Sequence, residues 1–234
     1  MAPGLTTRDA WISWLQQPQA VSESLGKIPL KQIPPLLRRR FNTLGRCAVG
    51  AALPLLSEGE CISSIFASRH GDTGLTLSLL EGMGRSEPMS PTGFSLAVHN
   101  AVSGLFSIAR KDTSAVVSIA AMEGLVLQAL LEAGGQLQGV ERVLCVIYDV
   151  PLPPLYQPYS ESDPFPYAIA MILGRTEGNR FTIDLQGKQS AGRTPASGDL
   201  DTEPMRLLHL LAGRTDHLDL QANGACWRMS KVAD

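Results

Sequence analysis

Residues of the types used in acid–base or nucleophilic chemistry lie in two short segments. The first, residues 68–72 (SRHGD), holds Ser68, Arg69, His70 and an aspartate, which are side chains of a hydrolase triad and its surroundings. Residues so close in one loop rarely reach triad geometry, and the serine lacks the GxSxG surroundings of a nucleophile elbow. We therefore expect a structural loop in which Arg69 forms a salt bridge, in preference to a hydrolase site.

The second segment is the pair His99-Asn100, which falls in a stretch of helical periodicity. On a helix, His99 would lie at the edge of the apolar face near Val102, and Asn100 would lie on the side of Gly104. Two interpretations stay open. The favoured one is a pair that holds a helix end or a neighbouring strand by hydrogen bonds. The other is that the pair lines a ligand pocket or contacts a partner.

The sequence lacks the motifs of several other chemistries. It contains no HExxH, no Gly-rich phosphate loop, no carboxylate-rich metal cluster and no dinucleotide fingerprint. The cysteines are scattered and form no CxxC pair; they are Cys47, Cys61, Cys145 and Cys226. We expect no cofactor, no metal and no disulfide.

The composition is that of a globular protein, with 44% hydrophobic and 18% charged residues and a net charge of -2 over 234 residues. A net charge this close to zero gives no long-range attraction to nucleic acid. The basic cluster at 38–40 is typical of a solvated face. The sequence has no apolar run of about 18 residues and no signal peptide. We expect no nucleic-acid or membrane partner and a cytoplasmic location.

Apolar periodicity predicts the elements that must position these residues. Helices are expected at 43–56, 75–80, 90–109, 122–133 and 203–212, strands at 61–67, 114–120, 142–150, 167–173, 181–185 and 217–220, and loops at 151–166 and 191–201. Gly134-Gly135 is expected to end the helix before it. Residues 1–35 are expected to pack as an arm on a single domain, 36–234.

The stretch 90–109 is the most informative. Ser90-Pro91 is a good helix entry, because serine caps the helix and proline presets its first turn. One side is apolar and the other carries small residues, which predicts a central helix approached closely on both sides. The strand–helix–strand order over 114–150 predicts a right-handed parallel crossover between buried strands. The expected fold class is α/β, layered α/β/α.

The phrases FASRHGDTGLTLSLL, MSPTGFSLAVHNAVSGLFSI and DVPLPPLY, with residues 118–125, resemble the ketoacyl synthase branch of the thiolase fold. More specifically, the chain resembles short β-ketoacyl synthase amino-terminal-domain-like proteins. Those accompany aryl polyene and related type II polyketide gene sets, and some serve as chain-length factors. The resemblance covers residues 34–185 and implies half of a thiolase-like fold.

Departures from that family decide the expected activity. A ketoacyl synthase places its nucleophilic cysteine where a strand meets a helix, because the helix dipole and backbone amides favour a thiolate and an oxyanion there. Here the resemblance places Ala121 at that position, and His209 and His217 lie in no Gly/Thr-rich loop of the family's kind. The carboxy-terminal half that supplies the family's two histidines is not expected in this chain. The resemblance therefore implies no catalytic residue and a chain-length-factor-like partner of a β-ketoacyl-ACP synthase.

The same resemblance suggests residues for the acyl tunnel or the interface. They are Phe94, His99, Asn100, Gly104, Ser118 and Met122. Met122 and Phe94 could narrow a tunnel, although such side chains more often belong to a core. The strand over 114–119 is expected at the edge of the sheet, where it needs covering. The implied partners are a catalytic ketosynthase subunit or a second copy of this chain, with an acyl carrier protein bound transiently.

Two rival functions stay open. A decarboxylase or hydrolase of acyl groups on a carrier protein would use His99 or His70, with the backbone amides near Ala121 as an oxyanion site. An adaptor that binds a carrier protein without affecting chain length would use neither. The lack of a reactive side chain at Ala121 favours the partner subunit.

Overall fold

A computed structural model describes residues 1–22, 24–26, 28–160, 162–188 and 202–232, so the expected loop 191–201 lies outside the described residues. The helices are α1 (Arg8–Gln16), α2 (Pro35–Arg38), α3 (Thr43–Ala52), the 3-10 helix η1 (Leu53–Leu55), α4 (Thr73–Gly84), α5 (Pro91–Leu96), α6 (Ala101–Arg110), α7 (Leu125–Gln136) and α8 (Glu203–Leu211). The strands are β1 (Ser63–Ala67), β2 (Val116–Ile119), β3 (Arg142–Asp149), β4 (Tyr167–Gly174), β5 (Phe181–Lys188), β6 (His217–Ala222) and β7 (Ala225–Lys231). No described helix is long and apolar enough to cross a membrane.

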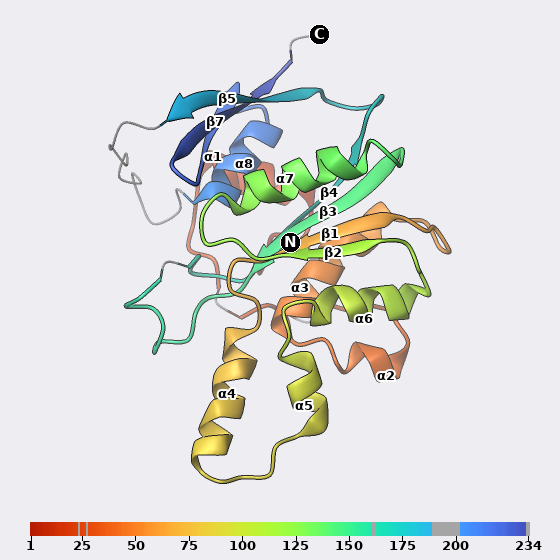
Figure 1. Cartoon of the computed structure of the whole chain (residues 1–234), viewed down its shortest axis with the longest axis vertical. Helices are drawn as coiled ribbons and strands as arrows, with labels where there is room; N and C mark the ends of the chain where they lie inside the picture. Colours follow the sequence, from red (N-terminus) through yellow and green to blue (C-terminus); the bar gives the residue numbers. More distant parts are fainter. Residues whose placement is uncertain (23, 27, 161, 189–201, 233–234) are drawn as a thin grey trace.

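The main sheet has the strand order β2-β1-β3-β4 (Figure 1). Strands β2 and β3 both run parallel to β1, and β4 runs antiparallel to β3. The strands before and after α7 are therefore parallel, as predicted, with β1 between them. Among the described strands β2 pairs with β1 alone, so it lies at the edge of the sheet, also as predicted.

Successive residues of β1 and β3 point to opposite faces of this sheet. Ile65, Val143 and Cys145 pack in the cluster that includes residues of α1, α7 and α8. Phe66 and Leu144 pack in the other cluster, with residues of α3 and α6. Figure 1 shows the same arrangement, with α7 and α8 on one side of the sheet and α3 and α6 on the other. Both faces of the sheet are covered, which accounts for the apolar run inside β3, and the predicted α/β/α layering is confirmed.

A second, antiparallel sheet with the order β5-β7-β6 lies beyond α7 and α8 (Figure 1). The prediction from sequence lacks β7. The turn that joins β6 to β7 is Asn223-Gly224, with φ angles of 52° and 73° that these two residue types tolerate best. An Asn-Gly pair between apolar runs is a strong hairpin signal, so β7 was predictable from the sequence.

The predicted helix 90–109 is in fact two helices, α5 and α6, joined by a turn. Ser90 caps α5 as predicted, because its hydroxyl oxygen accepts a backbone N–H of the first turn at 3.1 Å. Helix α5 ends at Leu96, and His99 lies in the turn before α6, where its Nε2 is 2.9 Å from the carbonyl oxygen of Ser68. The prediction of one continuous helix is therefore wrong.

Other helix boundaries also differ from the prediction. Helix α7 begins later than expected, because Gly124 before it has a left-handed backbone with φ of 65°. The same helix continues through Gly134-Gly135, where a side chain would meet nothing within 4 Å. Helix α4 begins two residues earlier than predicted, because a carboxylate oxygen of Asp72 accepts the backbone N–H of Leu75 at 3.0 Å.

Candidate functional site

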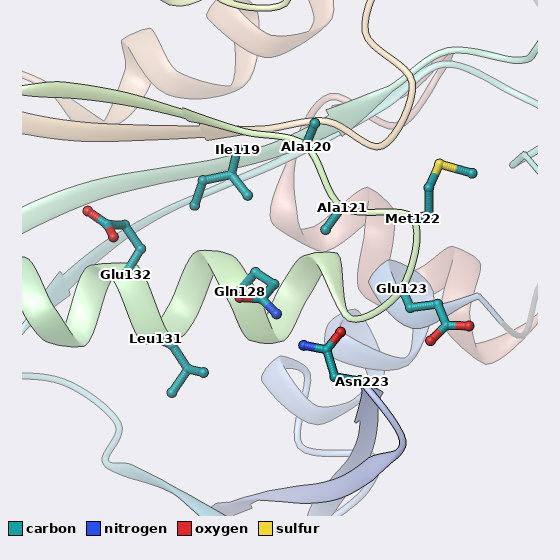
Figure 2. Close-up of a pocket in the computed structure, with 9 residues that line it drawn as sticks. All are labelled: Ile119, Ala120, Ala121, Met122, Glu123, Gln128, Leu131, Glu132 and Asn223. Atoms are coloured by element: carbon teal, nitrogen blue, oxygen red, sulfur yellow. The ribbon is translucent and has the colours of Figure 1, made fainter.

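An open hollow of about 750 Å³ lies beside the unpaired edge of β2 (Figure 2). Its wall consists of the end of β2, the loop 120–124, one face of α7 and the β6–β7 turn. The lining residues are Ile119, Ala120, Ala121, Met122, Glu123, Gln128, Leu131, Glu132 and Asn223. Figure 2 shows the methyl group of Ala121 pointing toward α7. The hollow therefore lies at the strand–helix junction that the sequence singled out.

The loop 120–124 is fixed at its end by Gly124. A Cβ on this residue would lie 2.7 Å from the Cβ of Ala222 and 2.8 Å from the carbonyl oxygen of Gln221. Its φ of 65° is also unfavourable for residues with a side chain. Only glycine fits both constraints, so the second sheet helps to position the loop and to shape the hollow.

Backbone N–H groups in the first turn of α7 already have an acceptor, the side chain of Glu203. Burial raises the pKa of the Glu203 carboxyl on α8, while hydrogen bonds from the backbone N–H groups of Val126 and Leu127 lower it. A helix start that binds an oxyanion needs donors that are aimed at an empty position. An oxyanion site at this helix start would therefore have to displace Glu203.

The cysteines do not replace the missing nucleophile. Burial raises the pKa of the Cys47 and Cys145 thiols to about 12, so neither forms the thiolate that nucleophilic attack requires. Cys61 is exposed ahead of β1 and Cys226 lies on β7. Within the described part of the chain, none of the four lines the hollow.

Ser68, Arg69 and His70 form hydrogen bonds other than those of a triad. The hydroxyl of Ser68 donates to Oδ1 of Asp149 at 2.7 Å. The same carboxylate accepts the backbone N–H groups of Arg69 at 2.9 Å and His70 at 3.3 Å. A serine whose proton is held by a buried carboxylate is not activated by a histidine. This geometry supports the structural loop that the sequence favours.

The predicted interface residues of α6 and β2 lie at the edge of the sheet. The hydroxyl oxygens of Ser118 and Ser103 lie 2.8 Å apart. Gly104 is exposed, and a Cβ there would meet nothing within 4 Å. Asn100 is exposed at the start of α6 and its side chain does not cap the helix. Within this chain, neighbouring elements pack against one side of α6 only, and the side that carries Gly104 is exposed. The prediction of close packing on both sides therefore holds for one side.

Phe94 and Met122 are not core residues. Phe94 is 63% exposed on α5, and Met122 is 56% exposed in the loop 120–124. Helices α4 and α5 project from the body as a pair (Figure 1), and neither contains a buried residue. In Figure 2 the side chain of Met122 points away from α7. Both side chains are thus available to a partner, although they lie on different elements.

His99 lies away from the hollow. It lines a second cavity of about 220 Å³ between α3, α6 and the α4–α5 pair, which shares no lining residue with the hollow. Its ring is half-buried, and Nε2 makes the bond to Ser68 described above. The bond fits the favoured interpretation, a residue that holds the structure by hydrogen bonds, and the cavity fits the other one, a residue that lines a pocket, so both stay open.

The sequence analysis predicts none of the polar residues that line the hollow. Gln128, Leu131 and Glu132 share one face of α7, because residues three and four apart lie on the same side of a helix. Asn223 comes from the turn whose Asn-Gly pair marks the β6–β7 hairpin. Both signals are present in the sequence, but only the packing of the second sheet against α7 brings these residues to one site.

The layered sheet, its crossover and the strand–helix junction at the hollow define an α/β domain of the thiolase-like kind. Residues 11–230 match the family model described as β-ketoacyl synthase, N-terminal domain, and the chain belongs to this family. The match covers nearly all of the chain, so it includes the second sheet as well as the main one.

Two of the solved structures that resemble the chain contain a ketosynthase and a chain length factor. One is a ketosynthase (ApeO) in complex with its chain length factor (ApeC) from Xenorhabdus doucetiae, with a TM-score of 0.79 and 26% identity over 98% of this chain and 94% of that chain. The other, the ishigamide ketosynthase/chain length factor, shares the fold, with a TM-score of 0.59 and 12% identity over 77% of this chain and 63% of that chain. A comparison with curated proteins found no match.

Proposed function

We propose that this chain is a non-catalytic, chain-length-factor-like subunit that pairs with a catalytic β-ketoacyl-ACP synthase and shapes its acyl tunnel. The observation that carries the proposal is Ala121, which lines the hollow at the strand–helix junction and has no reactive side chain. In the partner, the equivalent strand–helix junction would hold the nucleophile. This chain would form part of the wall of the acyl tunnel.

The unpaired edge of β2 supports a heterodimer. Next to it lie the exposed apolar side chains of Val116, Met122 and Leu131, which are 37%, 56% and 41% exposed. An unpaired strand flanked by apolar side chains favours association with another chain. The similar structure from Xenorhabdus doucetiae is a ketosynthase in complex with its chain length factor, which makes a ketosynthase the first partner to test.

Chain-length control would come from bulk at the interface. Met122 and Phe94 present flexible or bulky apolar side chains outside the core of this subunit, where they can enter a tunnel shared with the partner. We propose that the pathway makes an aryl polyene, a polyketide or a fatty-acid-type chain on an acyl carrier protein. The cytoplasmic location, the absence of a cofactor and the division into an arm (1–35) and a domain (36–234) stay predictions.

The test is co-expression with the ketosynthase encoded nearby, followed by size-exclusion chromatography and a malonyl-condensation assay of each species. A stable mixed complex whose products lengthen in Met122→Ala or Phe94→Ala supports the proposal. Leu185→Ala is the matched control, because this side chain on β5 is 58% exposed and lies on the second sheet; it should leave product length unchanged.

The rival function, a decarboxylase or hydrolase, is tested in the same experiment. It requires turnover of an acyl thioester by this chain alone, and loss of that turnover in His99→Ala or His70→Ala. If the chain stays apart from the ketosynthase and hydrolyses or decarboxylates the thioester unaided, the partner proposal is wrong.

A further inference from the structure

The second cavity, beside His99, has a buried apolar end and an exposed rim. It measures about 220 Å³ and lies between α3, α6 and the α4–α5 pair. The side chains at its inner end are buried and apolar; they are Phe41, Leu44, Val102 and Leu105. Leu75 on α4 and Leu96 on α5 complete the apolar wall. The inner end therefore suits an apolar group of a ligand.

The size of the cavity sets the length of that group. Protein interiors are close-packed, so an empty space of this size is uncommon. An apolar cavity of roughly 150 Å³ in another protein is large enough to bind benzene. A cavity of about 220 Å³ can accordingly take an apolar chain of about six to eight carbons.

Several polar side chains that line the cavity already have partners within the chain. Asn42 caps α3 and donates through Nδ2 to the carboxylate of Asp72. Asp72 caps α4, and Ser90 caps α5. Nε2 of His99 lies 2.9 Å from a backbone carbonyl oxygen. These groups hold the walls of the cavity together.

Arg40 differs from these residues. It is exposed and lines the cavity, so it lies at the rim. The guanidinium groups of Arg38 and Arg46 donate to the carbonyl oxygens of Ile33 at 3.2 Å and of Arg38 at 3.0 Å. The Arg40 side chain has no hydrogen bond or ion pair with any residue that the structure describes. A guanidinium group is always charged and fits a carboxylate well, so Arg40 is available to an anion.

Asp72 limits the charge of that anion. Its carboxylate belongs to the same lining and repels a negative head group. A head group with one negative charge is repelled less than a phosphate monoester, which carries nearly two at neutral pH. A carboxylate also accepts two parallel hydrogen bonds from one guanidinium. The lining therefore favours a carboxylate over a phosphate.

We propose that this cavity binds a monocarboxylate with an apolar tail of about six to eight carbons. The carboxylate pairs with Arg40, and the tail lies between α3, α6 and the α4–α5 pair. This site goes beyond the proposed function, because it shares no lining residue with the hollow at Ala121. Its test also requires no partner subunit.

Occupation of the cavity has a consequence for the α4–α5 pair. Neither helix contains a buried residue, and elements with little buried surface open easily. A tail that packs against Leu75 and Leu96 adds apolar contacts to both helices. The bound ligand should therefore protect this pair from local opening.

The first experiment is titration calorimetry of the full chain with octanoate at about pH 7.5, where a carboxylic acid is ionised. We expect one site with a Kd below about 1 mM. Uncharged 1-octanol and octyl phosphate should each bind roughly tenfold more weakly. Absence of octanoate binding would overturn the inference. Equal affinity for 1-octanol would overturn the role of Arg40, and tighter binding of octyl phosphate would overturn the choice of a carboxylate.

Two variants with matched controls locate the site. Arg40→Gln should weaken octanoate binding roughly tenfold and leave 1-octanol binding unchanged. Arg39→Gln should leave both unchanged, because Arg39 is an exposed neighbour outside the cavity lining. Ala101→Leu should fill the cavity and weaken both ligands at least roughly tenfold. Ala109→Leu is its control, since Ala109 is half-buried on the same helix and does not line the cavity.

Unchanged octanoate affinity in Arg40→Gln and Ala101→Leu would show that octanoate binds elsewhere and would overturn the inference. If Ala101→Leu does not fold, Arg40→Gln decides alone, because an exposed side chain can be replaced at little cost in stability.

The second experiment is amide hydrogen exchange of wild type with and without saturating octanoate. Exchange in residues 73–96 should slow roughly tenfold, whereas the exposed strand β5 on the second sheet should not change. Bound octanoate that leaves residues 73–96 unchanged would overturn its placement against α4 and α5. None of these outcomes depends on the proposed pairing with a ketosynthase, so the two proposals fail or succeed separately.

Discussion

The hydroxyl oxygens of Ser103 and Ser118 lie 2.8 Å apart and join α6 to the edge strand β2. Ser103 is 2% exposed and its hydroxyl donates to the carbonyl oxygen of Asn100 at 3.0 Å, so Ser118 is the donor in the pair. The edge strand, which pairs with β1 on one side only, is therefore also held from a helix. This bond positions the strand that the proposed partner would cover.

We expect Ser103→Ala and Ser118→Ala each to lower the free energy of unfolding by about 1 kcal/mol, because each removes one partner of a half-buried hydrogen bond. Urea unfolding of the single and double variants measures the interaction between the two side chains. The double variant should lose less free energy of unfolding than the sum of the two single losses. Ser95→Ala is the control, since that hydroxyl bonds only to a backbone carbonyl on an exposed face. Strictly additive effects of the two substitutions would show that the pair contributes no interaction energy.

Gly124→Ala should be strongly destabilising. Its Cβ would lie 2.7 Å from the Cβ of Ala222, and its φ of 65° disfavours any side chain. We expect a loss of about 2 kcal/mol or more in the free energy of unfolding, together with weaker partner binding. Gly135→Ala is the matched control: it lies in α7 with nothing within 4 Å of the added carbon. That variant should gain up to about 1 kcal/mol from helix propensity, and equal losses in both variants would contradict the prediction.

Asp163 should make the stability depend on pH. Burial raises its pKa from 3.8 to about 6, so between these values the folded chain binds more protons than the unfolded chain. Its contribution to the free energy of unfolding therefore falls as the pH rises through this window, by about 3 kcal/mol in total. Asp163→Asn should remove about that much of the fall, as measured by urea unfolding from acid to neutral pH, whereas exposed Asp184→Asn should keep it. Burial also raises the pKa of Asp149 and Glu203, so a smaller slope should remain; a slope in Asp163→Asn as steep as in wild type would contradict the prediction.

The cysteines should differ sharply in reactivity toward a thiol reagent. Exposed Cys61 should react first in the native protein and half-buried Cys226 more slowly. Cys47 and Cys145 should react only after unfolding, because burial raises the pKa of both thiols to about 12. Mass spectrometry of labelled peptides measures the order. If Cys61→Ala abolished condensation by the assembled complex, the prediction that this chain contributes no nucleophile would be wrong.

The layered main sheet was predictable because its signals are local. The continuous apolar run of β3 indicates a strand covered on both faces, and it is buried between α7 on one side and α3 on the other. The Ser90 cap also follows from a short segment, whereas the edge position of β2 was expected from the resemblance. The extra strand β7 has a local signal of the same kind in Asn223-Gly224.

The broken helix could not be predicted from periodicity. Apolar spacing continues from 94 to 109, but α5 ends at Leu96, and His99 in the turn after it bonds to the carbonyl oxygen of Ser68, 31 residues away. The bond from Ser68 to Asp149 shows the same limit, since the two residues are 81 positions apart. Such contacts exist only after the sheet has formed, so no window of sequence contains them.

The sequence by itself determined most of the elements and the layering and, through its resemblance, the edge strand and the replacement of a nucleophile by Ala121. The tertiary structure decided that Ala121 lines an open hollow, that Glu203 accepts the backbone N–H groups at the start of α7, and that Phe94 and Met122 lie outside the core. The physical reason is that periodicity and capping depend on neighbouring residues. A cavity, a contact between distant segments and an exposed surface depend on how the whole chain packs.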